Sequence, residues 1–207
     1  MKNINVALKN HYQSLKGCNL CGEMTGPPVM GKLIHSSILL IGQAPGSREP
    51  ELQKPFGWTA GRTLFKWFSS IGLSETDVRN LIYISAICRC FPGKSSASGD
   101  RIPNKDEINT CSQWLEFEIK LLKPKLIIPI GKLAISEFVS FDLLTDVVGK
   151  NMQKKCHGVC CDIIPLPHPS GLSSWHKSNP GKLLLEQALQ LIKEHSAFKK
   201  ILYKVKN

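Results

Sequence analysis

Long apolar runs and a signal-peptide pattern are both absent from this sequence. No stretch of about eighteen or more apolar residues occurs, which is the length that a membrane-spanning helix needs. Residues 1–16 lack the basic, apolar and small-residue zones of a secretory signal. We therefore expect a soluble, cytoplasmic protein with no membrane partner.

Glycine-rich phosphate-binding motifs are missing as well. Neither GxGxxG nor a P-loop pattern follows any apolar run that could form a strand. This disfavours a nucleotide-binding enzyme of the doubly wound type. Because the 207 residues contain no internal repeat and no linker-like segment, we expect one domain over residues 1–207.

Acidic residues are scarce relative to basic ones. The chain has 16 Asp and Glu against 27 Lys and Arg, a net charge of +11. Such an excess favours an anionic partner, nucleic acid above all, because Lys and Arg neutralise phosphates. Four lysines near the end of the chain predict a basic tail over about residues 196–207.

Short apolar runs alternate with helical patterns along the chain. The predicted strands are 36–41, 81–87, 126–130 and 162–167, and the predicted helices are 5–16, 59–71, 104–122, 132–138 and 180–193. Pro129 cannot donate a backbone hydrogen bond, which places the third strand at a sheet edge or ends it irregularly. The alternation predicts a three-layer α/β/α sandwich around a four-stranded, mainly parallel sheet.

Unusual loops follow three of the four predicted strands. They are GQAPGSRE at 42–49, RCFPGK at 89–94 and HPSGLS at 168–173. Open parallel sheets bind ligands in the crevice at the carboxyl ends of their strands. The sequence therefore predicts a site that these three loops form together.

Together the three loops resemble the motifs of the family 4 uracil-DNA glycosylases. GQAPGSRE followed by PFGWTAGRTL at 55–64 is similar to the first motif, commonly written GEAPGxxE and then PFVGxAGxLL. HPSGLS is similar to the closing His-Pro-Ser motif of the wider superfamily, and RCFPGK to the KCRPP segment. The resemblance runs in order over about residues 18–192. It implies a monomeric base-excision repair enzyme that removes uracil, or a related damaged base, from DNA.

The resemblance assigns the first motif to holding a base that has been flipped out of the helix. Backbone N–H groups around Gly42, Ala44 and Gly46 would come close to the base, since glycine permits close approach. Phe56 would form the stacking floor beneath the base. Taken alone, such a loop is often an ordinary turn, and a Phe after Pro is often a core residue.

The last motif would serve the chemical step. By the resemblance, His168 faces the departing base and stabilises the negative charge that collects on it, with Ser170 beside the substrate. Leu172 would wedge into the duplex and support base flipping, with simple packing as the alternative.

Two positions depart from the family pattern. Gln43 replaces the first acidic residue, and an amide in the catalytic site can position water or a base but cannot accept a proton from water. Glu49 matches the second acidic residue, so we expect it to polarise the water. Ala86 stands where the family has an Asn that reads the edge of uracil, which leaves Ser85 or the backbone to read that edge.

Four of the eight cysteines match the iron–sulfur ligands of the family. The resemblance implies a [4Fe-4S] cluster on Cys18, Cys21, Cys90 and Cys111. Their spacing alone also permits a structural zinc site with four cysteine ligands. Cys88 reads as a small buried hydrophobe.

Three further cysteines, Cys156, Cys160 and Cys161, surround Gly158, which suggests the turn of a β-hairpin. Successive residues of a strand point to opposite faces, which disfavours a metal site there.

The leading functional hypothesis is a uracil-DNA glycosylase. The alternative is an iron–sulfur DNA-binding protein of the same fold that recognises lesions with weak or no hydrolysis, and Gln43 and Ala86 keep this alternative open.

Overall fold

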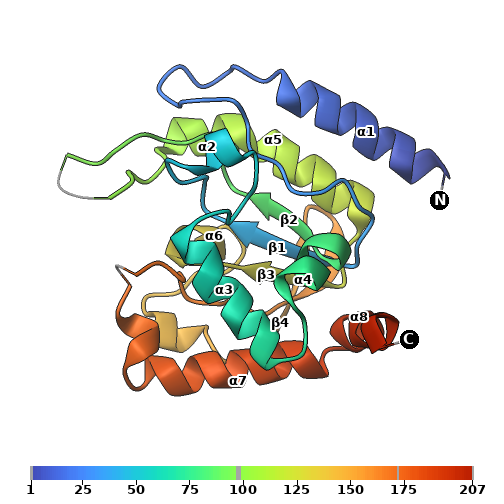
Figure 1. Ribbon diagram of the computed structural model, residues 1–207, viewed down its shortest axis with the longest axis vertical. Helices are drawn as coiled ribbons and strands as arrows, with labels where there is room; N and C mark the ends of the chain where they lie inside the picture. Colours follow the sequence, from blue (N-terminus) through green and yellow to red (C-terminus); the bar gives the residue numbers. More distant parts are fainter. Residues whose placement is uncertain (1, 97–98, 172, 207) are drawn as a thin grey trace.

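The computed structural model describes residues 2–96, 99–171 and 173–206 (Figure 1). Its sheet has five strands in the order β2-β1-β3-β5-β4. The strands are β1 (Ile38–Gly42), β2 (Tyr83–Ala86), β3 (Leu126–Pro129), β4 (Met152–Cys156) and β5 (Val159–Ile163). The first three and β5 are parallel, and β4 runs antiparallel to β5.

The list of four predicted strands omitted β4, which forms one edge of the sheet, and only the predicted hairpin turn at Gly158 pointed to it. Its sequence, MQKKC, has three exposed residues and no apolar run, so it resembles a loop. It is held by the antiparallel register with β5, from Met152 opposite Ile163 to Cys156 opposite Val159.

The central strands are buried because helices cover both faces. All residues of β1 and of β3 are buried, as expected for strands covered on two sides. Pro129 ends β3, but this strand lies between β1 and β5, so the edge position predicted as one option is wrong.

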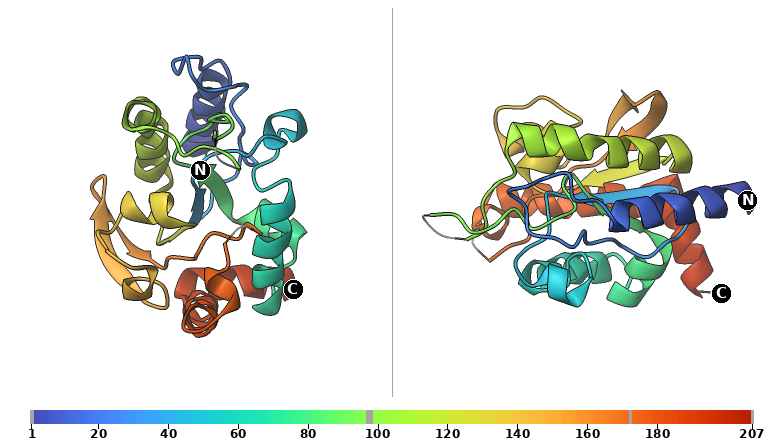
Figure 2. Two further views of the ribbon diagram at one scale, coloured as in Figure 1. Left: turned by 90° about the vertical axis from the view of Figure 1, so that its left-hand side faces the viewer. Right: turned by 90° about the horizontal axis from the view of Figure 1, so that it is seen from above.

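Helices α1 and α5 cover one face of the sheet, and α3, α4, α7 and α8 lie on the other (Figures 1 and 2). The predicted three-layer α/β/α arrangement is confirmed. The helices are α1 (Lys2–Lys16), α2 (Glu49–Leu52), α3 (Thr59–Ser70), α4 (Glu75–Leu81), α5 (Lys105–Leu122), α6 (Lys132–Ser136), α7 (Gly181–Glu194) and α8 (Ser196–Lys206), with 3₁₀ turns η1 (Leu144–Asp146) and η2 (Trp175–Lys177). Among the described residues, none of these helices is both long and apolar enough to cross a membrane.

The segment expected to be a basic tail instead forms helix α8. Ala197, Phe198 and Ile201 are buried on one side of it, and the ring of Phe198 lies 6.4 Å from that of Phe68 in α3. The apolar residues recur at helical spacing between the lysines, so burial of that stripe orders the segment.

Candidate functional site

A cavity of about 670 Å³ lies at the carboxyl ends of the parallel strands. It gathers the loop after β1, the end of β2 and the segment that follows β5, as the sequence predicted. Ten predicted residues line it: Gly42, Gln43, Ala44, Gly46, Glu49, Phe56, Ser85, Ala86, His168 and Ser170. Leu172 lies outside the described residues.

The ring of Phe56 lies against the end of β1 at Gly42. A Cβ on Gly42 would come within 2.8 Å of Cζ of Phe56, so only glycine permits this contact. Arg79 of α4 holds the turn, since its guanidinium donates to the carbonyl oxygens of Pro55 at 2.9 Å and Phe56 at 3.0 Å. These bonds fix Phe56 at a positive φ of 51°, which is unusual for a residue with a side chain.

Glu49 ties two loops of the cavity together. Its carboxylate oxygens accept the backbone N–H of Gly46 at 3.0 Å and that of Gly57 at 2.9 Å. The residue is only 8% exposed. Burial raises the pKa of Glu49, the two backbone hydrogen bonds and Arg79 oppose this, and Asp100 adds to it. Glu49 therefore shapes the first motif, and the N–H of Gly46 is already occupied.

His168 presents one ring nitrogen to a backbone donor. The N–H of Ser170 donates to Nδ1 of His168 at 3.3 Å, so in the neutral ring the proton resides on Nε2. Burial lowers the pKa of His168, and His176 of η2 lowers it further. The ring rests on Gly131, where a Cβ would lie 3.0 Å from Cδ2. His168 is thereby set up as a neutral donor.

Ser85 lines the cavity, but its proton is already engaged. Its Oγ donates to Oε2 of Glu118 at 2.8 Å, and Nη2 of Arg89 donates to the same oxygen at 2.6 Å. His11 and Tyr83 bond to the other oxygen of this fully buried carboxylate. Although burial alone would raise it, Arg89 and His11 hold the pKa of Glu118 at about 2. Ser85 is left with acceptor capacity.

Sequence reasoning missed part of the cavity wall. Asp100 and Arg101 line it from the loop after β2, next to Lys94 of the predicted RCFPGK loop, and Trp58 lines it at the start of α3. Asp100 and Arg101 lie beyond the three predicted loops, and no local pattern reveals which side chain of a loop turns inward. Trp58 lies within PFGWTAGRTL, the segment that resembles the first motif, and that position was the available signal.

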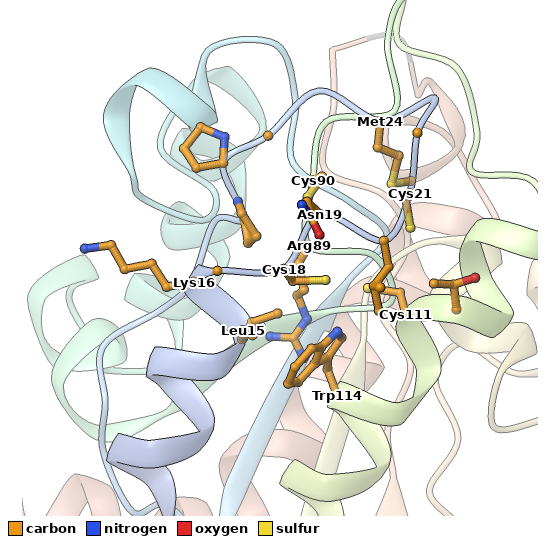
Figure 3. Close-up of a pocket in the computed structure, with 17 residues that line it drawn as sticks. Leu15, Lys16, Cys18, Asn19, Cys21, Met24, Arg89, Cys90, Cys111 and Trp114 are labelled. Atoms are coloured by element: carbon orange, nitrogen blue, oxygen red, sulfur yellow. The ribbon is translucent and has the colours of Figure 1, made fainter.

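A second cavity, of about 470 Å³, brings together the four cysteines matched to the cluster (Figure 3). Cys18 and Cys21 come from the loop after α1, Cys90 from the segment after β2, and Cys111 from α5. Arg89 lines this second cavity and Ser85 lines the first. Both side chains donate to Glu118, which therefore connects the two cavities.

The thiols of this cavity are suited to a cationic group. Burial, followed by the neighbouring thiols of Cys111, Cys18 and Cys21, raises the pKa of Cys90 to about 12. Thiolates this close need an electropositive partner. In the described ranges, no three His, Cys, Asp or Glu side chains converge closely enough to hold a single metal ion. Four cysteine thiols that line one cavity are, by residue type, the donor set of a [4Fe-4S] cluster.

The remaining cysteines lie outside this cavity. Cys88 is fully buried in the core, as predicted, and its S–H donates a hydrogen bond to Sγ of Cys111. The predicted hairpin is confirmed, since β4 and β5 pair on either side of His157 and Gly158. Cys160 is exposed whereas Cys161 is buried, so successive cysteines do face opposite sides.

Comparison with known proteins connects these features to one family. The profile of the Uracil DNA glycosylase superfamily matches residues 28–193. A type-4 uracil-DNA glycosylase of Saccharolobus solfataricus is 30% identical, covering 80% of this chain and 74% of that protein. A type-4 uracil-DNA glycosylase of Pyrobaculum aerophilum is 27% identical, covering 80% of this chain and 84% of that protein. A type-5 uracil-DNA glycosylase of Thermus thermophilus is 26% identical, covering 88% of this chain and 94% of that protein. The chain belongs to the uracil DNA glycosylase superfamily.

Proposed function

We propose that this protein is a uracil-DNA glycosylase that hydrolyses the bond between uracil and deoxyribose in DNA. The observation that carries the proposal is the shared cavity, in which the Phe56 ring over Gly42 and the donor of His168 come together at the strand ends. A flat apolar floor and a hydrogen-bond donor are what a flipped pyrimidine with a departing negative charge requires.

Phe56 and His168 divide the work of binding and leaving-group stabilisation. The flipped base stacks on Phe56, a contact worth about 1–3 kcal/mol. As the bond between C1′ of the sugar and N1 of uracil breaks, the electron pair stays with the base. The Nε2–H of His168 then donates to the base oxygen on which the charge collects. Glu49 holds the loop in place for this step, and its expected contact with the water remains a prediction.

Uracil is recognised here without the family's Asn. Because the Ser85 hydroxyl donates to Glu118, its oxygen can only accept toward the cavity. The N3–H of uracil is a donor, so Ser85 supplies the complementary group. Ala86 leaves space at the same edge for water or for a larger base, which makes related damaged bases further candidate substrates.

The cysteine cavity holds a [4Fe-4S] cluster in this proposal, with Cys18, Cys21, Cys90 and Cys111 as ligands. The cluster supplies iron–thiolate bonds that tie the loop after α1 to α5 and to the segment after β2. Its role would be architectural, near the DNA backbone, in a protein that acts on DNA as a monomer.

Gln43 and Ala86 favour a second candidate, a lesion-binding iron–sulfur protein with weak or no hydrolysis. Incubating the protein with a uracil-containing oligonucleotide and then cleaving abasic sites with alkali separates the two. The glycosylase proposal predicts strand cleavage at uracil and none in the matched thymine oligonucleotide. Tight, uracil-selective binding without cleavage would favour the second candidate.

A further inference from the structure

We propose that Asp100 is the carboxylate that accepts a hydrogen bond and then the proton from the attacking water. This inference rests on the proposed function and adds a catalytic residue to it. Asp100 belongs to none of the three motifs that resemble the family, and it lies in the loop after β2.

Asp100 enters the cavity next to the first motif. Its Oδ2 lies 3.2 Å from the position that a Cβ on Gly46 would occupy. It lines the same cavity as Gln43, Glu49 and His168. The side chain is 36% exposed, so it meets the solvent that fills the cavity.

Two residues of the first motif that could contact the water, Gln43 and Glu49, are poorly placed for this task. Gln43 carries an amide, which does not take up a proton at neutral pH. Both carboxylate oxygens of Glu49 are occupied by backbone N–H groups of Gly46 and Gly57. Asp100 also lines the cavity, and its Oδ2 is directed at Gly46 of the first motif. Among the described residues, no backbone N–H donates to this oxygen.

A set of bonds fixes the backbone around Asp100. The N–H of Arg101 donates to the carbonyl of Gly93 at 3.0 Å, and the Arg101 guanidinium pairs with Glu107 at the start of α5. Nζ of Lys94 donates to Oδ1 of Asp100 at 2.7 Å and reaches Oγ of Ser47 at 3.3 Å. The ion pair thus engages Oδ1, while Oδ2 faces Gly46 of the first motif and accepts no hydrogen bond from the described residues, so that it can accept one from water.

The step balances without any further reactant. The C1′–N1 bond breaks and its electrons leave with uracil, whose oxyanion takes the hydrogen bond from His168. Water forms the new bond to C1′ and passes one proton to Oδ2 of Asp100, from which it returns to solvent. The product sugar is an abasic site, and the released base takes up a proton from solvent.

The test compares Asp100→Asn with Lys94→Met in single-turnover excision of uracil at saturating enzyme. Asp100→Asn should slow cleavage by about ten-fold or more, the range of a lost general base, and Asp100→Glu should recover part of that loss. Lys94→Met removes the ion pair but keeps the carboxylate, so its loss should be clearly smaller. Circular dichroism and thermal unfolding of each variant exclude misfolding as the cause.

The outcomes separate this inference from the proposed function. If the wild type excises uracil and Asp100→Asn is equally fast, Asp100 takes no part in the reaction and only this inference fails. If Lys94→Met loses as much as Asp100→Asn, the pair merely holds the loop, and the inference fails in that case too. If the wild-type protein releases no uracil at all, the proposed function fails first and the inference with it.

Discussion

The backbone N–H of Ser170 donates to Nδ1 of His168 at 3.3 Å. This contact comes from two residues of one motif, and it selects the tautomer of the ring. A neutral His168 with its proton on Nε2 can stabilise the departing base by a hydrogen bond alone, without a positive charge. The His-Pro-Ser sequence therefore determines both where the imidazole lies and which nitrogen donates.

The pH dependence of excision tests this tautomer. Burial and His176 lower the pKa of His168 below its ordinary value of 6.5, so the ring is already neutral at pH 7. The single-turnover rate should not decline between about pH 6.5 and 8.5 through loss of an imidazole proton. A decline in that range that disappears in His168→Gln would show that the charged ring is the active form.

The lowered pKa of His168 also makes the stability of the folded protein depend on pH. A His whose pKa is lower in the folded than in the unfolded state binds fewer protons when folded. Its contribution to the free energy of unfolding is present above about pH 6.5 and is lost as the pH falls towards the folded pKa. Thermal unfolding of wild type and His168→Gln should therefore diverge less at pH 5.5 than at pH 7.5.

A methyl group at Gly42 should displace the stacking floor. Its carbon would lie 2.8 Å from Cζ of Phe56, which the ring can relieve only by moving. Gly42→Ala should slow excision by about ten-fold, corresponding to about 1.4 kcal/mol of lost stacking. Combining it with Phe56→Ala should add little, since neighbouring changes that remove one interaction are not additive. If the losses in excision rate of the two variants were fully additive, Gly42→Ala would act through something other than the Phe56 ring.

Iron content tests the cysteine cavity. The purified protein should be brown and contain iron, because thiolate-bound clusters absorb in the visible range. Cys111→Ala should bleach it and lower the unfolding temperature, since the ligands join distant segments. Cys88 is a neighbouring thiol that does not line the cavity, so the control variant Cys88→Ala should retain the colour. Stoichiometric zinc without iron after anaerobic purification would establish the zinc alternative.

Salt dependence tests which lysines face DNA. The logarithm of the affinity for duplex should fall with the logarithm of salt concentration by about 0.9 for each neutralised phosphate. Lys94, beside the cavity, should account for about one such unit. Lys199 and Lys200 lie on α8, at the end of the molecule opposite the loop that carries Lys94 (Figures 1 and 2). Replacing both by Ala should leave the slope unchanged. A decrease in slope as large as that of the Lys94 variant would show that DNA also contacts α8.

Much of the fold follows from local pattern. Apolar runs such as SSILLI can only be buried on both sides, and they form the parallel strands as predicted. The edge strand β4 was missed because its stability comes from pairing with β5 and not from an apolar run of its own. Helix α8 was missed because the lysines dominate the composition while three apolar residues determine the structure.

The part of the candidate site that could be predicted consists of motifs that directly follow a strand. The loops around Gly42, Ala86 and His168 meet because parallel strands share one carboxyl edge. Asp100 could not be found in this way, since its place in the cavity depends on the Arg101 pair with Glu107 and on the Lys94 bond. The engagement of Glu49 with two backbone donors is likewise a tertiary contact, with no sequence signal beyond the motif itself.

The role of His168 in excision can be measured by single-turnover cleavage of a uracil-containing duplex, by the wild type and by His168→Ala. We expect alkali-sensitive cleavage at uracil by the wild type, slowed by about ten-fold or more in the variant, while DNA affinity stays nearly unchanged. Equal rates for the two proteins, or no cleavage by either despite uracil-selective binding, would be incompatible with a glycosylase that uses His168 to stabilise the leaving base.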